Sequence, residues 1–477
     1  MDAVEPSDEA ESGIQAESAR PAIEDFHEFT AAHPQLAADS QDMLYRLSME
    51  RHLTFRDEPF SRYLRPHMLT PGQHAFITGV VRTLARAMVK LRRAALQDER
   101  LLDELALEPE ERRLALLDPG FEEPSPAMRL DSFWSEHDWR FVEINAESPA
   151  AIAYEDVLAD VFLELPLIRA WMDERGYRLR PLYARDRFMR AIMDVWREFR
   201  AARGGQFNER PNIAIVDWEG VSTASEFTLF KEYFESRGLP TVIVDPRHLE
   251  FRNGRLWAED FLIDIYYKRV LTSELLADPE AARPTVQAYE AGAICVINSF
   301  RAKLLHKKIS LGLLHDEANA HLFAPDELEA VRRHIPWTRR VREGYTTFEG
   351  QQIDLLPFIA DHREQLVLKP NDEYGGKGVV IGWTVSDDQW QRAIQQALET
   401  PYVVQWAVRL EYEPYPYYDQ THGVDFRDLA ADLDPFVFGT DTQGILTRLS
   451  AAALLNVTAG TGSVVPTMVV ESTGGGG

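Results

Sequence analysis

Residues 366–380 read LVLKPNDEYGGKGVV, an apolar run that ends in a lysine, followed by a polar turn and a second apolar pair. Glycine lets backbone N–H groups approach phosphate oxygens closely, and two lysines add positive charge to the same turn. The turn is not a Walker A loop, because its glycine spacing differs and no Ser or Thr follows Lys377. It predicts triphosphate contacts, with a plain β-hairpin carrying exposed lysines as the alternative. The residues concerned are Lys369, Gly375, Gly376, Lys377 and Gly378.

A second cationic segment lies upstream, at residues 301–308 (RAKLLHKK), in a chain that is otherwise acidic. On a helix, Lys303 and Lys307 would share a face at i and i+4, where like charges repel unless an anion lies against them. A solvated basic face is the alternative for an isolated charge run. Because a glycine turn with two further lysines occurs in the same half of the chain, we interpret both segments as parts of a nucleotide site.

A third group of polar residues lies in residues 129–131 (RLD) and 142–149 (VEINAESP). Residues 140–145 alternate polar and apolar as a strand does, so Glu143 and Asn145 project from the same face. Together with Asp131 they offer the hard oxygen ligands that Mg²⁺ prefers. Arg129 could meet phosphate oxygens that the same ion bridges. Buried capping or ion-pair roles are the alternative.

The spacing of these residues resembles that of the glutathionylspermidine synthetase-like enzymes, which have a circularly permuted ATP-grasp fold. That family has Arg-x-Asp, then Glu-x-Asn twelve residues after the Asp, then Ser or Thr three residues further on. Here the matching residues are Arg129, Asp131, Glu143, Asn145 and Ser148. The resemblance covers residues 129–466 and implies ATP and Mg²⁺ as cofactors. It implies Asp131, Glu143 and Asn145 as Mg²⁺ ligands, Arg129 on phosphate and Ser148 on substrate.

The same resemblance implies roles for later residues. Lys307 and Lys369 match the two ATP lysines, residues 402–405 match the hinge strand that ends at Gln405 and pairs with adenine, and Arg448 matches an arginine over the transferred phosphate. The chain also departs from the family. No amidase domain precedes residue 129, residues 336–361 look inserted between the two lysines, and a second metal set in the unpermuted order is present in part, at Asp432, Asp434 and Asn456.

The order of elements predicts an α/β protein, because apolar strand-like runs alternate with helical patterns between residues 211 and 297. In an open sheet of this kind, Lys268 and Arg269 at a strand end could hold an acidic substrate, or could be solvated cations. Six segments are expected: an acidic disordered arm (1–40), an N-terminal helical region (41–128), a permuted metal-binding segment (129–180), a pre-ATP-grasp-like α/β domain (181–298), the ATP-grasp domain (299–470) and a flexible tail (471–477).

Composition excludes several classes of function. The 51 Lys and Arg against 77 Asp and Glu leave a net charge of −26, which argues against a nucleic-acid partner. The one cysteine, Cys295, lies in an apolar run and is expected to be a packed strand residue. No leader or long apolar run indicates a membrane, so a cytoplasmic protein is expected. Neither a zinc-ligand pattern, a Gly-x-Ser-x-Gly turn nor a Rossmann glycine pattern is present.

The sequence therefore predicts an ATP- and Mg²⁺-dependent carboxylate–amine ligase that works through an acyl phosphate, with small-molecule acid and amine substrates. Arg129 and Arg448 would stabilise charge at the reacting centre. A phosphotransferase that passes phosphate to a hydroxyl, and a nucleotide-binding interaction protein without catalysis, are the alternatives.

Overall fold

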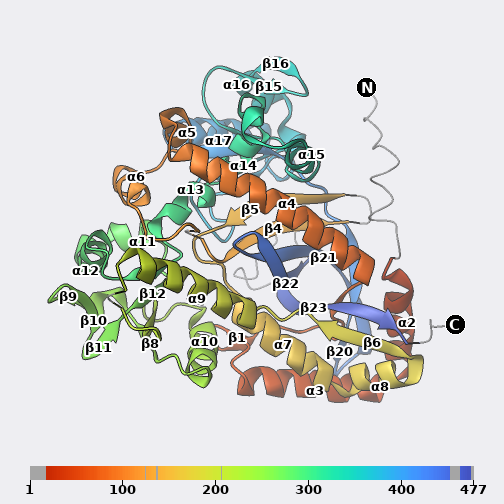
Figure 1. Cartoon of the computed structure of the whole chain (residues 1–477). Helices are drawn as coiled ribbons and strands as arrows, with labels where there is room; N and C mark the ends of the chain where they lie inside the picture. Colours follow the sequence, from red (N-terminus) through yellow and green to blue (C-terminus); the bar gives the residue numbers. More distant parts are fainter. Residues whose placement is uncertain (1–17, 124, 136–137, 206, 452–461, 474–477) are drawn as a thin grey trace.

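The computed structural model describes residues 18–123, 125–135, 138–205, 207–451 and 462–473, and Figure 1 traces them from red N-terminal helices to blue C-terminal strands. Helices and strands are mixed along the whole of this length, so the chain is an α/β protein. Within the described residues, one eight-stranded sheet and two four-stranded sheets organise the fold.

The eight-stranded sheet joins strands from early and late parts of the chain. Its path runs β3-β23-β22-β21-β4-β5, with β20 beside β21 and β6 beside β23. Phe133 on β4 lies opposite Asp432 on β21, and Asp131 lies opposite Glu143 on β5. Residues about 300 positions apart therefore share one surface. The strands are β3 (His67–Leu69), β4 (Met128–Trp134), β5 (Trp139–Asn145), β6 (Tyr177–Pro181), β20 (Tyr412–Asp419), β21 (Gly423–Phe438), β22 (Asp441–Ser450) and β23 (Ser463–Ser472).

A four-stranded parallel sheet with the order β13-β12-β7-β8 forms a second unit. Its strands are β7 (Ile213–Val216), β8 (Thr241–Val244), β12 (Ile265–Lys268) and β13 (Cys295–Ile297), and Cys295 is buried as expected. Because β7 has β8 on one side and β12 on the other, the connections diverge at the carboxyl ends of β7 and β12, where open sheets bind ligands. A three-stranded meander of β9 (Leu249–Arg252), β10 (Arg255–Ala258) and β11 (Phe261–Ile263) precedes β12.

The other four-stranded sheet has the order β14-β19-β17-β18 and carries the glycine turn. Antiparallel pairing of β17 with β18 makes this segment a hairpin, as its two apolar runs predict. Residues 336–361, expected to be an insertion, contain β14, the β15–β16 hairpin and α16. The elements are β14 (Thr338–Arg340), β15 (Tyr345–Phe348), β16 (Gln351–Asp354), α16 (Leu355–Asp361), β17 (Leu366–Pro370), β18 (Val380–Ile381), α17 (Asp387–Glu399) and β19 (Tyr402–Trp406).

The N-terminal segment differs from the acidic disordered arm expected over residues 1–40. From Arg20 it is helical, as α2 (Arg20–Ala32) and α3 (Pro34–Glu50), while residues 1–17 lie outside the described residues. The expectation weighed net charge alone, whereas Phe26 and Phe29 are fully buried and Phe26 packs edge-on against Trp171. At the other end, β23 continues to Ser472 into the expected tail, and residues 474–477 are not among those described.

The expected helical region 41–128 also holds the small hairpin of β1 (Thr54–Phe55) and β2 (Glu58–Pro59). Its helices are α4 (Pro71–Ala95), α5 (Glu99–Glu104) and α6 (Pro109–Leu116). Thr70 caps α4 with a complete capping box, and Glu108 is the N-cap residue of α6, its backbone N–H donating to Glu111 at 3.1 Å.

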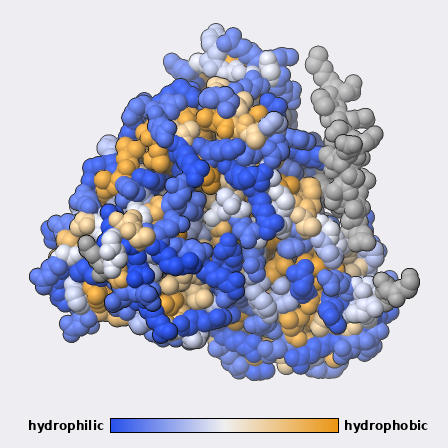
Figure 2. Space-filling model, viewed as in Figure 1, coloured by the Kyte–Doolittle hydropathy of each residue, from blue (hydrophilic) through white to orange (hydrophobic). Residues whose placement is uncertain are grey.

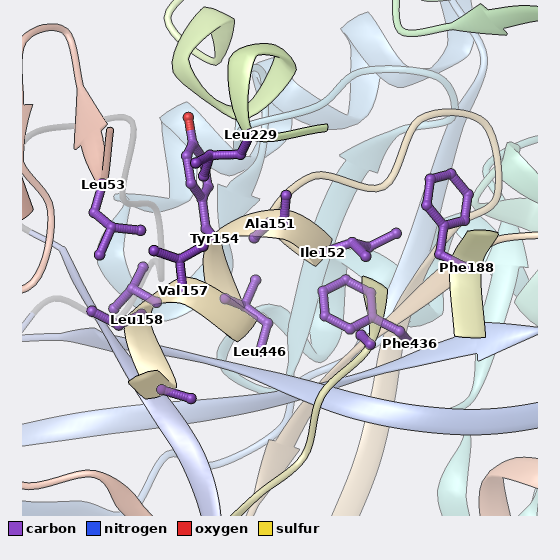
Figure 3. Close-up of a cluster of buried hydrophobic side chains, with 14 of the residues drawn as sticks. Leu53, Ala151, Ile152, Tyr154, Val157, Leu158, Phe188, Leu229, Phe436 and Leu446 are labelled. Atoms are coloured by element: carbon purple, nitrogen blue, oxygen red, sulfur yellow. The ribbon is translucent and has the colours of Figure 1, made fainter. Parts of the chain in front are cut away.

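Helix α7 (Ile152–Glu164) ties the units together. Figure 3 shows its residues Ile152, Tyr154 and Val157 packed among side chains from β21, β22 and two other helices. This packing fixes the first turn of α7, which lies beside the cavity described below. The remaining helices are α8 (Pro166–Arg175), α9 (Arg185–Ala202), α10 (Ala224–Ser236), α11 (Thr272–Ala277), α12 (Pro279–Glu290), α13 (Lys303–His306), α14 (Ile309–His315) and α15 (Pro325–His334).

The face seen in Figure 2 is mostly hydrophilic, with smaller hydrophobic patches between the charged side chains. None of the helices in the described part of the chain combines the length and the apolar character needed to cross a membrane.

Candidate active site

A cavity of about 600 Å³ lies where the three large sheets meet. It is lined from β4 and β5, from the turn between β17 and β18, from β19, from β22, and from the loops after β7 and β12. Four residues that the sequence analysis assigned to the site are not among the described residues that line the cavity: Lys268, Lys307, Lys377 and Gly378. The sequence-predicted residues that do line it are Arg129, Asp131, Glu143, Asn145, Ser148, Arg269, Lys369, Gly375, Gly376, Gln405 and Arg448.

Two arginines and three carboxylates form a charged cluster on the eight-stranded sheet. Arg129 donates to both oxygens of Asp131 at 2.8 and 3.0 Å. Nη2 of Arg448 lies 2.7, 2.6 and 2.8 Å from oxygens of Asp131, Asp432 and Asp434. Burial would raise the pKa of Asp131, but the charges of Arg129 and Arg448 outweigh it and hold that pKa below its usual range.

In the same cluster the pKa of Asp434 is shifted in the opposite direction. Burial raises the pKa of Asp434 well above its ordinary value, and the charge of Arg448 only partly opposes this. Burial raises the pKa of Asp432 as well. Two guanidinium groups facing three carboxyl groups balance when one carboxyl is neutral, and Asp434, whose pKa is raised well above its ordinary value, favours that form most. With Asp434 neutral, the positive and negative charges of the cluster balance. Arg448 contacts all three of its carboxyl groups.

A second charged group lies beside the first, around Glu143 on the neighbouring strand β5. Lys308 lies 2.9 Å from Glu143, and Lys369 donates to the side-chain oxygen of Gln405 at 2.6 Å and to the carbonyl of Val142 at 3.3 Å. Burial lowers the pKa of Lys369 to about 8, and the neighbouring Glu143 carboxylate opposes that fall. Two lysines therefore face the cavity beside the strand that carries Glu143.

The structure differs from the sequence assignment at Lys307. Helix α13 ends at His306, but the Lys307 backbone N–H still donates to the Lys303 carbonyl at 3.3 Å. Lys303 and Lys307 therefore share a face, as their i, i+4 spacing predicts, and both lie against Glu111 and Asp372. Lys307 lies 2.8 Å from both Glu111 and Asp372, whereas Lys308 lines the cavity. The sequence correctly required an anion against this lysine, but the anions are the protein's own carboxylates. The sequence analysis did not select Lys308, because two adjacent lysines give no signal of which one faces the cavity.

Lys307 belongs to a buried network of opposite charges beneath the cavity. Glu147 is fully buried and lies 2.6 Å from Lys268 and 3.0 Å from Lys303, and Lys303 lies 2.7 Å from Asp372. Three lysines face three carboxylates, so the network is neutral overall. Lys268, expected at a binding crevice, is 0% exposed within it. The members are Lys268, Lys303, Lys307, Glu111, Glu147 and Asp372.

The glycine turn borders the cavity through its first two glycines, Gly375 and Gly376. Gly375 and Gly376 have φ values of 63° and 75°, a left-handed conformation that favours glycine, and both line the cavity. Gly378 has a different role, since a Cβ there would lie 2.7 Å from the ring of Pro370. Lys377 is exposed and pairs with Glu373. Asp372, at the start of the turn, contacts Lys303 and Lys307 of the buried network, and these contacts hold that end of the turn in place.

The oxygen ligands proposed for Mg²⁺ come together at the cavity wall. Asp131 and Glu143 are cross-strand partners, and the side-chain amide of Asn145 donates to Asp131 at 2.8 Å. Two carboxylates and an amide oxygen suit Mg²⁺ in kind. Among the described residues no three His, Cys, Asp or Glu side chains are grouped to hold a metal, so the set depends on Asn145. Of the alternative set, Asp432 and Asp434 are bound to Arg448, and Asn456 is not among the described residues.

The parallel sheet supplies the opposite wall of the cavity. Arg269 follows β12, donates to the Pro149 carbonyl at 2.7 Å and pairs with Glu226, while Ser148 donates to the Arg269 carbonyl at 2.9 Å. Asp217 follows β7, and burial raises its pKa to about 6. The sequence did not single out Asp217, although its place directly after a buried strand was a usable signal.

No protein-family model matches this sequence. Among curated proteins, the chain is 22% identical over 273 residues to the uncharacterized protein sll0335 of Synechocystis sp. (strain ATCC 27184 / PCC 6803 / Kazusa). That match covers 53% of this chain and 52% of that protein, so the chain spans about half the length of the curated relative.

Two solved structures show a partial likeness. One, assigned as a gamma-glutamylcysteine synthetase from Methylobacillus flagellatus KT, has a TM-score of 0.40 at 11% identity, covering 84% of this chain and 89% of that chain. The other, D-alanyl-alanine synthetase A from Vibrio cholerae O1 biovar eltor str. N16961, has a TM-score of 0.23 at 14% identity, covering 46% and 67%. At these TM-scores neither likeness defines what this chain does.

Proposed function

We propose that the chain is an ATP-dependent carboxylate–amine ligase. The observation that carries the proposal is the cavity itself, which brings Lys308, Lys369, Arg129 and Arg448 from separate parts of the chain to one wall with the carboxylates Asp131 and Glu143. A net-acidic chain that gathers cations around a glycine turn has a site suited to a polyphosphate. The meeting of β4 and β5 with β21 and β22 also supports a circularly permuted ATP-grasp arrangement.

The contacts suggest an orientation for ATP. Apolar side chains of β17, β18 and β19, among them Val367, Ile381 and Trp406, line one end of the cavity and suit a purine ring. Strand β19 is flanked by β14 and β17, and the Ala407 backbone N–H donates to the Gln365 carbonyl at 2.8 Å. The backbone at Val408, which lines the cavity, is therefore the better hinge for adenine than residues 402–405. The triphosphate would then follow Lys369, Lys308 and the glycine turn toward the two arginines.

The chemistry follows from charge placement. A substrate carboxylate oxygen bonds to the γ-phosphorus as the bond to ADP breaks, and ADP leaves with the electron pair. An amine nitrogen then bonds to the acyl carbon, the bond to phosphate breaks, and the amine loses a proton. Arg129 and Arg448 hold the charge at this centre. Asp131, Glu143 and Asn145 would hold Mg²⁺, which would supply positive charge to the phosphate oxygens.

Glu143→Gln and Lys369→Met should each lower ATP turnover by roughly 10²–10³. Both side chains line the cavity and would contact phosphate or its metal. ADP release in the presence of Mg²⁺ and pooled acids and amines checks this. Lys231→Met and Glu235→Gln, from an exposed pair on α10, are the matched controls and should leave turnover unchanged. Unchanged turnover in the cavity variants would contradict the site, and a phosphorylated hydroxyl product would indicate a phosphotransferase instead.

ATP affinity should fall as the pH rises above about 8, because the triphosphate binds the charged form of Lys369 and the free protein loses that charge near its pKa of about 8. The loss approaches about tenfold per pH unit. Calorimetric titration with ATP between about pH 7 and about pH 9.5 measures it. Lys369→Arg keeps its charge and should flatten the curve. An equal decline in that variant would assign the effect to another group.

A further inference from the structure

Part of the cavity lining is apolar and consists of residues that the proposed ATP site does not use. We call these residues the apolar wall: Phe55, Phe60, Tyr154, Val221, Leu446 and Val464. Phe60 and Val464 are each 7% exposed and Tyr154 is 5% exposed, and all three belong to the hydrophobic core. The wall is thus a part of the core surface that is left open to the cavity.

The apolar wall is anchored by a small hairpin in the N-terminal region. Phe55 lies on β1 and Phe60 follows β2. The backbone carbonyl of Thr54 accepts a hydrogen bond from Ser225 at 2.8 Å, and Ser225 also contacts the Tyr154 hydroxyl at 2.6 Å. Because the Tyr154 hydroxyl has this partner, the ring can serve the cavity as an apolar surface. Figure 3 shows Tyr154 and Leu446 in the same cluster as the first turn of α7.

Contacts lead directly from the apolar wall to both arginines. Val464 is the cross-strand partner of Arg448, and its backbone N–H donates to the Phe60 carbonyl at 3.2 Å. The rings of Phe60 and Tyr154 are 5.0 Å apart. Arg129 donates to the Ala150 carbonyl at 3.0 Å, one turn before Tyr154. The apolar wall therefore borders the place where the acyl group would react.

In the series of contacts along the cavity, the charged residues come between the purine end and the apolar wall. Successive contacts run from Gln405 to Lys369, then through the strand of Glu143 to its partner Asp131, then to Arg448 and Val464. A nucleotide whose base lies near Gln405 would reach the arginines with its γ-phosphate, so the space beyond them is left for the acid.

We propose that the acid substrate carries an apolar body, branched or aromatic, which packs against the apolar wall while its carboxylate meets Arg129 and Arg448. This inference rests on the proposed ligase function and gives its substrate class. It also gives the β1–β2 hairpin a role, as a wall of the acid subsite. Burying such a body on Phe60, Tyr154 and Val464 favours it over a second charged group, which would lose its hydration there.

The inference is tested with hydroxylamine as the amine, because it converts an acyl phosphate to a stable hydroxamate. The probe acids are 4-methylpentanoate, glutarate of similar length with a second carboxylate, 3-phenylpropanoate and acetate. The wild-type protein should form hydroxamate from the branched and aromatic acids with a kcat/KM at least about tenfold above that for glutarate.

Phe60→Ala should lower kcat/KM for 4-methylpentanoate relative to acetate by roughly 10- to 200-fold, and Phe60→Leu should recover most of the loss. Phe121→Ala is the matched control, since Phe121 belongs to the same core and is 6% exposed but is not among the described lining residues. Its ratio should not change. ATP binding should be unchanged in both alanine variants.

The outcomes separate the two proposals. Hydroxamate from glutarate at a rate equal to or above that from 4-methylpentanoate would overturn the apolar subsite and leave the ligase function standing. An equal change of ratio in Phe60→Ala and Phe121→Ala would also overturn it. Absence of both ATP binding and hydroxamate would overturn the proposed function, and the apolar subsite with it.

Discussion

Replacing the neighbouring residues Lys307 and Lys308 by Met is expected to give two different defects. Lys308→Met should lower ATP turnover by roughly 10²–10³, because Lys308 lines the cavity beside Glu143. Lys307→Met should instead lower the free energy of unfolding by about 3–5 kcal/mol, because it leaves the buried network with one negative charge in excess. Steady-state ADP release and urea unfolding, measured on both variants, check the two effects.

The exposure of the partners explains the difference. Glu143 has 22% of its side chain exposed, so water can solvate it when Lys308 is absent. Glu111 has 2% exposed and has no such access when Lys307 is absent. Lys307→Met combined with Glu111→Gln restores neutrality and should recover stability. If the Lys307→Met variant is stable but no longer binds ATP, the result would show that Lys307 contacts ATP.

Local pattern was sufficient wherever one segment decides its own structure. The apolar runs of residues 366–370 and 402–405 become β17 and β19, and the alternation of residues 140–145 becomes β5 with Glu143 and Asn145 at the cavity. The spacing of the motif was also sufficient to predict that Asp131 lies beside Glu143, because β4 and β5 are adjacent in the chain and pair directly.

What the sequence could not provide was the outcome of contacts between distant segments. Lys268 and Lys307 are cations at plausible positions, yet Glu147 and Glu111 from earlier segments bury them. The apolar wall joins residues from both ends of the chain, and each member alone looks like ordinary core. Residues 20–40 were misjudged for a related reason, because acidic charge concealed the spacing of Phe26 and Phe29, which pack on the fold.

Arg448→Met should cause the largest combined loss, in turnover and in stability. It removes the cation that lies within 2.8 Å of Asp131, Asp432 and Asp434, leaving Arg129 alone with three carboxylates. We expect turnover to fall by roughly 10²–10³ and the free energy of unfolding to fall by about 3–5 kcal/mol. Arg82→Met, from an exposed pair with Asp441, is the control and should change neither quantity measurably.

A second substitution separates the two roles of Arg448. Asp432→Asn added to Arg448→Met removes a charged carboxylate and keeps the side-chain oxygen that accepts the backbone N–H of residue 448 at 2.9 Å. Stability should recover, because fewer carboxylates then face Arg129, while turnover should stay low, because no guanidinium replaces the one at the acyl centre. Recovery of turnover together with stability in the double variant would show that Arg448 only neutralises the carboxylates. Low turnover in a stable double variant is the result expected if Arg448 acts on the transferred phosphoryl group.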